Sequence, residues 1–314
     1  MSTEVAIETR DLVKKFNEHF TALDKVSIEI HKGELVGYVG QNGAGKTTTM
    51  KILTNLLKPT SGEVYLEGIA VSKKPQEALR NVGTLIEVPG VYEYLTPHEM
   101  LSYFGKIYQM KNIDERIKEV LRLMNLTEWE HEKLSSFSTG MQRRFCIAKA
   151  ILHNPDILLL DEPVLGLDPK GMKDVRDLVR RLNKEGMTIF ISSHLLQELS
   201  ETVNRVIFIK KGRILESDTI ENIKGKVRPD VISIMFKDPL NPNDIEKMRS
   251  IGSVKDISQI NEHNLSLQFD GGADVIYQIL KKAIELDMKI ISYAPQTTNL
   301  EDYYLRVMGD LEVS

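Results

Sequence analysis

The chain has 314 residues, enough for about two domains. With 41% hydrophobic and 27% charged residues, its composition is that of a globular protein and excludes a largely disordered chain. The net charge of −4 disfavours a basic groove for nucleic acid, and the single cysteine excludes an intrachain disulfide framework or a cysteine-cluster metal site.

The first part of the chain has the pattern of alternating strands and helices. Short strands are expected at 5–9 and 26–30, and the apolar run at 35–39 indicates a strand buried in a parallel sheet. A glycine-rich loop follows that strand and leads into a helix expected at 47–57. A turn then precedes another strand, at 64–66.

The glycine-rich loop carries the pattern G-x-x-x-x-G-K-[ST]. Its glycines let successive backbone N–H groups face phosphate oxygens, and the following helix adds its positive N-terminal dipole. We expect Lys46 to bind the β- and γ-phosphates of a nucleotide, and the Thr47 hydroxyl to bind Mg²⁺. The predicted nucleotide-binding residues here are Gly40, Gln41, Asn42, Gly43, Ala44, Gly45, Lys46, Thr47 and Thr48.

From about residue 88 to 154 the pattern is helical, which indicates a helical subdomain inserted into the α/β fold. The sequence Thr-Pro-His-Glu at 96–99 marks a helix start, with a threonine N-cap. A later helix is expected at 138–152. On it, Arg143 and Arg144 fit either a phosphate or partner contact or a solvated helix face.

An apolar strand expected at 157–160 ends in two carboxylates. In a P-loop fold the first of them, Asp161, holds Mg²⁺. The second, Glu162, can orient and deprotonate an attacking water.

The remaining elements of this region also alternate. A helix expected at 169–184 is followed by strands at 188–192 and 205–209. This order is typical of an α/β fold with a largely parallel sheet, here a P-loop NTPase core.

The pattern changes near residue 224. Beyond it we expect strands at 231–236, 254–260, 265–269 and 289–293 and helices at 242–249, 274–286 and 300–308. The order β-α-β-β-α-β is that of a ferredoxin-like α+β domain. The sequence therefore predicts two domains, 1–224 and 225–314.

Three further motifs accompany the P-loop and the acidic strand end. They are Phe-Ser-Thr-Gly-Met at 137–141, Gly-Leu-Asp at 166–168 and Ser-Ser-His at 192–194. In this order the set resembles the nucleotide-binding domain of ABC transporters, whose signature motif is usually Leu-Ser-Gly-Gly-Gln. The tail resembles the accessory domain of some ABC-2-type exporters, and residues 85–92 look like the bacitracin and lantibiotic self-protection branch.

This resemblance implies a RecA-like P-loop core, a helical signature subdomain and a composite site. Two copies bind head to tail around two ATP molecules, and Ser138 and the Gly140 N–H of one copy contact the γ-phosphate held by the other. The resemblance makes Glu162 the general base and His194 the switch histidine that steadies the attacking water, and it makes Lys46 part of the catalytic set. Phe16 corresponds to the aromatic residue that stacks on adenine.

Some of these positions depart from the family pattern or have a plainer explanation. Glu87 replaces the Q-loop glutamine, where its carboxylate meets Mg²⁺ directly or through water; a solvated loop acid is the alternative. Thr139 and Met141 replace a glycine and the glutamine of the signature, which implies a weaker contact across the dimer. Ser138 also fits a simple N-cap, and Phe16 a core residue.

No apolar run approaches the ~20 residues that span a bilayer, so we expect the chain not to cross a membrane itself. The resemblance then implies an ATPase that converts ATP and water to ADP and phosphate, with Mg²⁺ as cofactor. Its dimer would drive a separate transmembrane permease at the cytoplasmic side of the cell membrane, without a nucleic-acid partner. The tail favours an exporter of drugs, antibiotics or lipids; an importer subunit or a non-transport ABC ATPase is the alternative.

Overall fold

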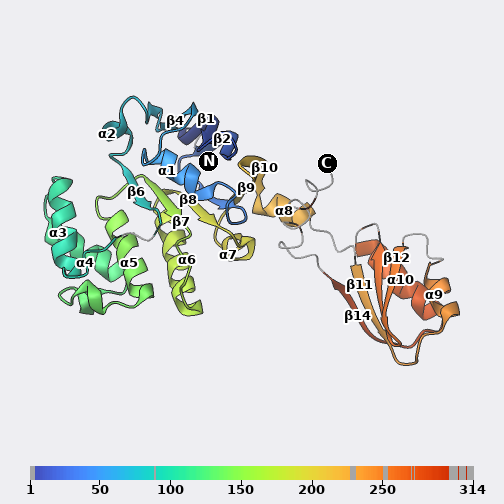
Figure 1. Ribbon diagram of the computed structural model, residues 1–314. Helices are drawn as coiled ribbons and strands as arrows, with labels where there is room; N and C mark the ends of the chain where they lie inside the picture. Colours follow the sequence, from blue (N-terminus) through green and yellow to red (C-terminus); the bar gives the residue numbers. More distant parts are fainter. Residues whose placement is uncertain are drawn as a thin grey trace. The chain divides into compact units, whose positions relative to one another are not determined.

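Figure 1 shows the computed structural model of the chain, which divides into two compact units, residues 1–220 and 221–314. The division falls in α8 (Ile220–Lys226), the helix that also contains the predicted boundary at 224/225. The structure describes residues 4–87, 90–226, 231–249, 254–269, 271, 273–296, 303 and 309.

The first unit is built around a six-stranded sheet with the order β10-β9-β3-β8-β7-β6. Its strands are β3 (Leu35–Val39), β6 (Val82–Leu85), β7 (Ile157–Asp161), β8 (Thr188–Ser193), β9 (Arg205–Lys210) and β10 (Arg213–Thr219). Neighbouring strands are parallel, except that β10 pairs antiparallel with β9. Every residue of β3 and β7 is buried, as expected for strands covered on both faces.

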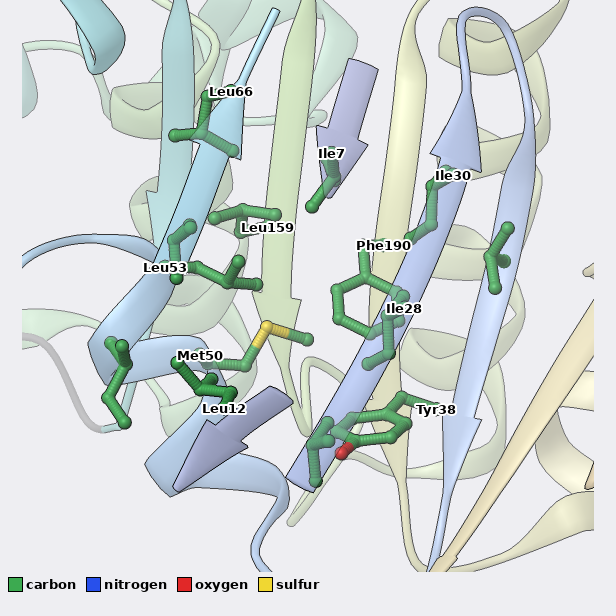
Figure 2. Packing of buried hydrophobic residues seen from close by; sticks show 14 of the residues in the cluster. Ile7, Leu12, Ile28, Ile30, Tyr38, Met50, Leu53, Leu66, Leu159 and Phe190 are labelled. Carbon is green, nitrogen blue, oxygen red and sulfur yellow. The ribbon is translucent and has the colours of Figure 1, made fainter. Parts of the chain in front are cut away.

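A second, antiparallel sheet of the same unit has the order β2-β1-β4-β5. Its strands are β1 (Val5–Lys15), β2 (Thr21–His31), β4 (Ser61–Leu66) and β5 (Ile69–Ala70). The main core of the unit draws its buried side chains from both sheets and from α1 (Lys46–Leu53). Figure 2 shows Ile28 of β2 beside Tyr38 and Phe190, whose ring centroids are 5.1 Å apart.

Further helices complete the first unit. They are α2 (Pro75–Ala78), α3 (Pro97–Ile107), α4 (Ile113–Leu123), α5 (Thr139–Ala150), α6 (Pro169–Lys184) and α7 (Leu196–Ser200), with short 3-10 turns η1 (Thr127–Trp129) and η2 (Leu134–Ser136). The helices α3, α4 and α5 lie together at one end of the unit (Figure 1). The capping box expected at the start of α3 is present, because Thr96 and Glu99 exchange side chain–backbone hydrogen bonds.

The second unit contains the elements β11 (Val231–Phe236), α9 (Pro242–Arg249), β12 (Val254–Asn261), β13 (Asn264–Phe269), α10 (Ala273–Glu285) and β14 (Ile290–Gln296). Its sheet is antiparallel, with the strand order β12-β13-β11-β14. Ile232 and Ile234 of β11 pack against Met248 of α9 and Ile279 of α10 in a separate core. The helix predicted at 300–308 lies outside the described residues, except for residue 303.

Within the part of the chain that the structure describes, every helix is too short or too polar to cross a membrane.

Candidate functional site

The glycine-rich loop between β3 and α1 packs so closely on its neighbours that glycine is required at two positions. Gly45, the N-cap of α1, has a φ of 111°, and an added Cβ would lie 2.7 Å from the carbonyl oxygen of Ala22. At Gly40 an added Cβ would lie 2.5 Å from the carbonyl oxygen of Ile209. The loop is therefore held against both sheets of the first unit.

The turn between β9 and β10 connects this loop to β2. The Gly212 N–H donates to the Ala44 carbonyl oxygen at 2.9 Å, and the Gly212 carbonyl oxygen accepts from the Asp24 N–H at 2.8 Å. An added Cβ at Gly212 would lie 2.6 Å from the same Ala22 oxygen that limits Gly45. Sequence reasoning did not predict this contact, since its only local signal is a glycine after an expected strand.

A pocket of about 290 Å³ lies over the loop and the first turn of α1. Loop residues and Lys46, Thr47 and Thr48 form one side of it, and Glu162 and His194, which follow β7 and β8, form another. The carboxyl ends of adjacent parallel strands thus bring together residues that are far apart in the sequence, as in other α/β proteins.

Lys46 is the buried cation of this pocket, with 6% of its surface exposed. Its Nζ donates to the carbonyl oxygens of Gly40 at 2.6 Å and Gln41 at 3.3 Å, and lies 3.3 Å from Oε1 of Glu162. A buried ammonium needs such partners. Phosphate oxygens would offer the same cation stronger, charge-assisted bonds, so the loop and Lys46 fit the phosphate groups of a nucleoside triphosphate.

Oxygen atoms suited to Mg²⁺ converge beside Lys46. Oδ2 of Asp161 accepts from the Thr47 hydroxyl at 2.7 Å, and Oδ1 accepts from the Ser192 hydroxyl at 2.5 Å. No cluster of three or more His, Cys, Asp or Glu side chains among the described residues could hold a metal alone. Mg²⁺ normally takes one or two protein ligands together with phosphate oxygens and water, so this donor set fits it.

Glu162 is held in place by several groups. Its Oε2 lies 3.0 Å from Nδ1 of His194, and its backbone N–H donates to the Ser192 hydroxyl at 3.0 Å. Its φ of 48° lies in the left-handed region that non-glycine residues seldom adopt. Ser192 was predicted only as part of a motif; the structure places it between the two carboxylate residues.

The helix that carries the Phe-Ser-Thr-Gly-Met motif begins with a side-chain cap. Ser138 is exposed, and its hydroxyl accepts from the Met141 N–H at 3.3 Å, so the N-cap interpretation is confirmed. Neither Ser138 nor Gly140 belongs to the residues that line the pocket of the same chain. Their contact with a nucleotide held by another copy stays a prediction.

An aromatic pair lies beside the pocket. Phe16 is 53% exposed, so its interpretation as a core residue is wrong. Its ring stacks on Phe20 with centroids 5.9 Å apart, and it is Phe20 that lines the pocket. Sequence reasoning missed Phe20, although a hairpin turn at this point could have suggested that both rings share one side.

Glu87 lies outside the pocket lining. Its carboxylate pairs with Nζ of Lys51 at 2.5 Å, on the last turn of α1, and its side chain is 58% exposed. The ion pair accounts for the acid without a metal, and a contact with Mg²⁺ stays a prediction.

Comparisons with known proteins point to one family. The family model described as ABC transporter matches residues 23–165. The chain is 37% identical to the uncharacterized ABC transporter ATP-binding protein YcbN of Bacillus subtilis, with 98% of each chain covered. It is 33% identical to the bacitracin transport ATP-binding protein BcrA of Bacillus licheniformis, over 96% of this chain and 97% of that protein. It is 30% identical to the linearmycin resistance ATP-binding protein LnrL of Bacillus subtilis, over 95% of this chain and 96% of that protein.

Solved structures share the fold of the first unit. A dimeric ATP-binding cassette in a post-hydrolysis state, bound to ADP and phosphate, gives a TM-score of 0.63 at 27% identity, over 68% of this chain and 98% of that one. A cassette in its ADP conformation gives 0.64 at 25% identity, over 70% of this chain and 95% of that one. The predicted P-loop fold is therefore confirmed over about 70% of the chain.

Proposed function

The chain belongs to the ABC transporter ATP-binding proteins, and we propose that it powers an exporter of drugs, antibiotics or lipids. It binds ATP and hydrolyses it to ADP and phosphate, as its family does. The observation that carries the exporter proposal is similarity over the whole length, residues 221–314 included, to relatives named for bacitracin transport and linearmycin resistance.

In the proposed mechanism Glu162 accepts the proton of the attacking water. His194, 3.0 Å from the Glu162 carboxylate, orients that carboxylate and the water. Lys46 and the N–H groups of the loop stabilise the charge that develops on the γ-phosphate oxygens. Mg²⁺, held by Thr47 and Asp161, would supply further neutralisation of phosphate charge.

We assign the other half of the site to a second copy of the chain. Ser138 and Gly140, at the N-terminus of α5, would face the γ-phosphate bound by the partner copy, and the exposure of Ser138 supports this arrangement. Thr139 and Met141 replace the glycine and glutamine of the usual motif, so the contact across the dimer would be weaker than in most relatives. The dimeric cassette with 27% identity supports assembly as a dimer.

The adenine base would stack on the aromatic pair, with Phe20 at the pocket and Phe16 behind it in the same stack. A role of Glu87 toward Mg²⁺ would require its carboxylate to leave Lys51, from which it is 2.5 Å away.

The chain would work at the cytoplasmic side of the cell membrane through a separate transmembrane permease. Tyr92 and Tyr94, which are 50% and 69% exposed, are suitable anchors for that partner. We propose residues 225–314 as an accessory ferredoxin-like domain. The order of elements and the strand order β12-β13-β11-β14 support this assignment.

The export proposal can be tested in cells that contain the chain and a candidate permease. We expect this pair to raise the concentration of bacitracin or of another membrane-active antibiotic that stops growth. The same pair with Lys46→Ala should give no protection. Equal sensitivity with the wild-type and Lys46→Ala proteins, across a panel of such compounds, would count against export.

A further inference from the structure

Arg143 is buried although it carries a charge. It lies on α5 directly after the signature motif, and 9% of its surface is exposed. Its guanidinium donates to the backbone carbonyl oxygens of Glu162 at 2.5 Å and Pro163 at 3.2 Å, with a longer bond of 3.5 Å to that of Glu87. One side chain thus joins the signature helix to the residues after β7 and to the segment after β6. The interpretation of Arg143 as part of a solvated helix face is wrong.

Placing a guanidinium in this position is unfavourable unless its donors are satisfied. Burial lowers the pKa of Arg143, while the negative charges of Asp161 and Glu162 act in the opposite direction. Its hydrogen-bond acceptors are neutral carbonyl oxygens, and the planar, forked arrangement of guanidinium donors fixes the direction of each bond. The side chain is therefore suited to hold backbone at defined angles.

The backbone that Arg143 contacts at Glu162 has an unusual conformation. Glu162 has a φ of 48°, and a non-glycine residue keeps this conformation only when its surroundings fix it. Ser192 accepts its N–H, and Lys46 and His194 contact its carboxylate. Arg143 supplies the matching contact at its carbonyl oxygen.

We propose that Arg143 is a positioning residue for ATP hydrolysis, which fixes the backbone of Glu162 so that its carboxylate faces the nucleotide pocket. Because Arg143 belongs to α5, the position of the signature helix also sets the orientation of the general base. The weaker bond to the Glu87 carbonyl oxygen extends this link to the segment that precedes Tyr92 and Tyr94, the proposed anchors for the permease. This inference rests on the proposed role of Glu162 as general base.

The test compares Arg143→Gln and Arg143→Lys with the control Arg144→Gln. Arg144 is the next residue of α5, and its guanidinium donates to the Met124 carbonyl oxygen at 3.1 Å, within the helical subdomain. We expect Arg143→Gln to bind MgATP within about twofold of wild type while kcat falls roughly 10- to 100-fold, because displacement of a reacting group by about 1 Å can cost this much. Arg143→Lys should lose less, and Arg144→Gln should keep kcat within twofold.

A second comparison shows whether Arg143 acts through Glu162. Adding Arg143→Gln to Glu162→Gln should leave the residual turnover unchanged, since the base is already absent. A kcat within twofold of wild type in Arg143→Gln would overturn the proposal. So would a parallel loss of ATP affinity and thermal stability in both Arg143 variants, or a further loss of turnover in the double variant. Glu162→Gln measured alone shows separately whether the assigned base is correct.

Discussion

The two units of the molecule bury their strands in different ways. In the first unit every residue of β3 and β7 is buried, because the parallel sheet is covered on both faces. In the second unit buried and more accessible residues alternate along β11 and β13, because α9 and α10 contribute to a core on one face of the antiparallel sheet. Because both faces of the parallel sheet are covered, functional side chains can reach solvent only at the ends of its strands. The pocket, Asp161 and Glu162 lie at those ends.

This difference suggests that the two units have separate roles, which can be tested. The residues that line the pocket over the glycine-rich loop belong to the first unit, and the second unit has its own core. If the units are independent, changes in the second unit should leave ATP hydrolysis intact, and changes in the first unit should leave the stability of the second unit intact.

The largest expected effect is that of Lys46→Ala on ATP hydrolysis. Loss of this buried cation should lower turnover by about 100-fold or more, because in the proposed mechanism it stabilises the charge on the transferred phosphoryl group. Lys51→Ala, on the same helix, is the matched control and should keep turnover within a few-fold of wild type. Steady-state release of phosphate measures both. Wild-type turnover in Lys46→Ala would break the assignment of the pocket.

The next effect concerns the core of the second unit. Leu267 is fully buried there, and Leu267→Ala should destabilise that unit by roughly 2–5 kcal/mol. Thermal unfolding followed by calorimetry should show the loss. Basal ATP hydrolysis at a temperature below the transition should stay within twofold of wild type. A proportional fall in hydrolysis would show that the second unit supports the site.

Cys146 offers a probe of the first unit alone. It is buried on α5, and burial raises the pKa of its thiol to about 11. Its reaction with an alkylating reagent at pH 8 should therefore be about 100-fold slower than that of a free thiol. Because the unfolded thiol ionises at lower pH than the folded one, stability should also decrease as the pH rises from about 9 to 11. Leu267→Ala should not speed alkylation if the units unfold independently.

The smallest effect is expected at the ion pair between Lys51 and Glu87. Glu87→Gln leaves the Lys51 ammonium uncompensated, so it should raise ATP affinity without Mg²⁺ by a few-fold. Lys51→Met leaves the carboxylate uncompensated near the phosphates and should weaken this affinity by a few-fold. The double variant should restore it. Nucleotide titrations with and without Mg²⁺ measure these affinities. A large Mg²⁺-dependent change of ATP affinity in Glu87→Gln alone would indicate that Glu87 contacts the metal.

Local patterns predicted most of the fold. The runs that became β3, β7 and β8 are continuously apolar, and α6 has strong helical spacing, so their positions follow from period and hydrophobicity. Strand β10 was not predicted, because five of its seven residues, Arg213, Glu216, Ser217, Asp218 and Thr219, are charged or polar at a partly exposed sheet edge. The helix after the loop ends at Leu53 rather than at residue 57, and Asn55 follows in a left-handed conformation.

The site divides in the same way. Short motifs with fixed spacing identified Lys46, Thr47, Asp161, Glu162 and His194 as site residues, and their roles stay predictions. The structure brings all five to one edge of the sheet. Phe20 could have been inferred from a local hairpin turn, whereas the contacts of Ser192 and Arg143 are with residues distant in the chain, and a single sequence does not show that proximity.

The crowding around the Ala22 carbonyl oxygen has a consequence for how such proteins change over generations. An added Cβ at Gly45 or Gly212 would come within 2.7 Å of this one atom. A library of all single substitutions should therefore be depleted at Gly212 about as strongly as at Gly45, although Gly212 lies outside the pocket lining. Selection for glycine at this position would then reflect the lack of space for a Cβ, not a contact between Gly212 and the nucleotide. Second-site mutations that restore growth to a Gly212→Ala strain should therefore fall in β2, where they shift the backbone or reduce a side chain, rather than in the P-loop or the acidic strand end.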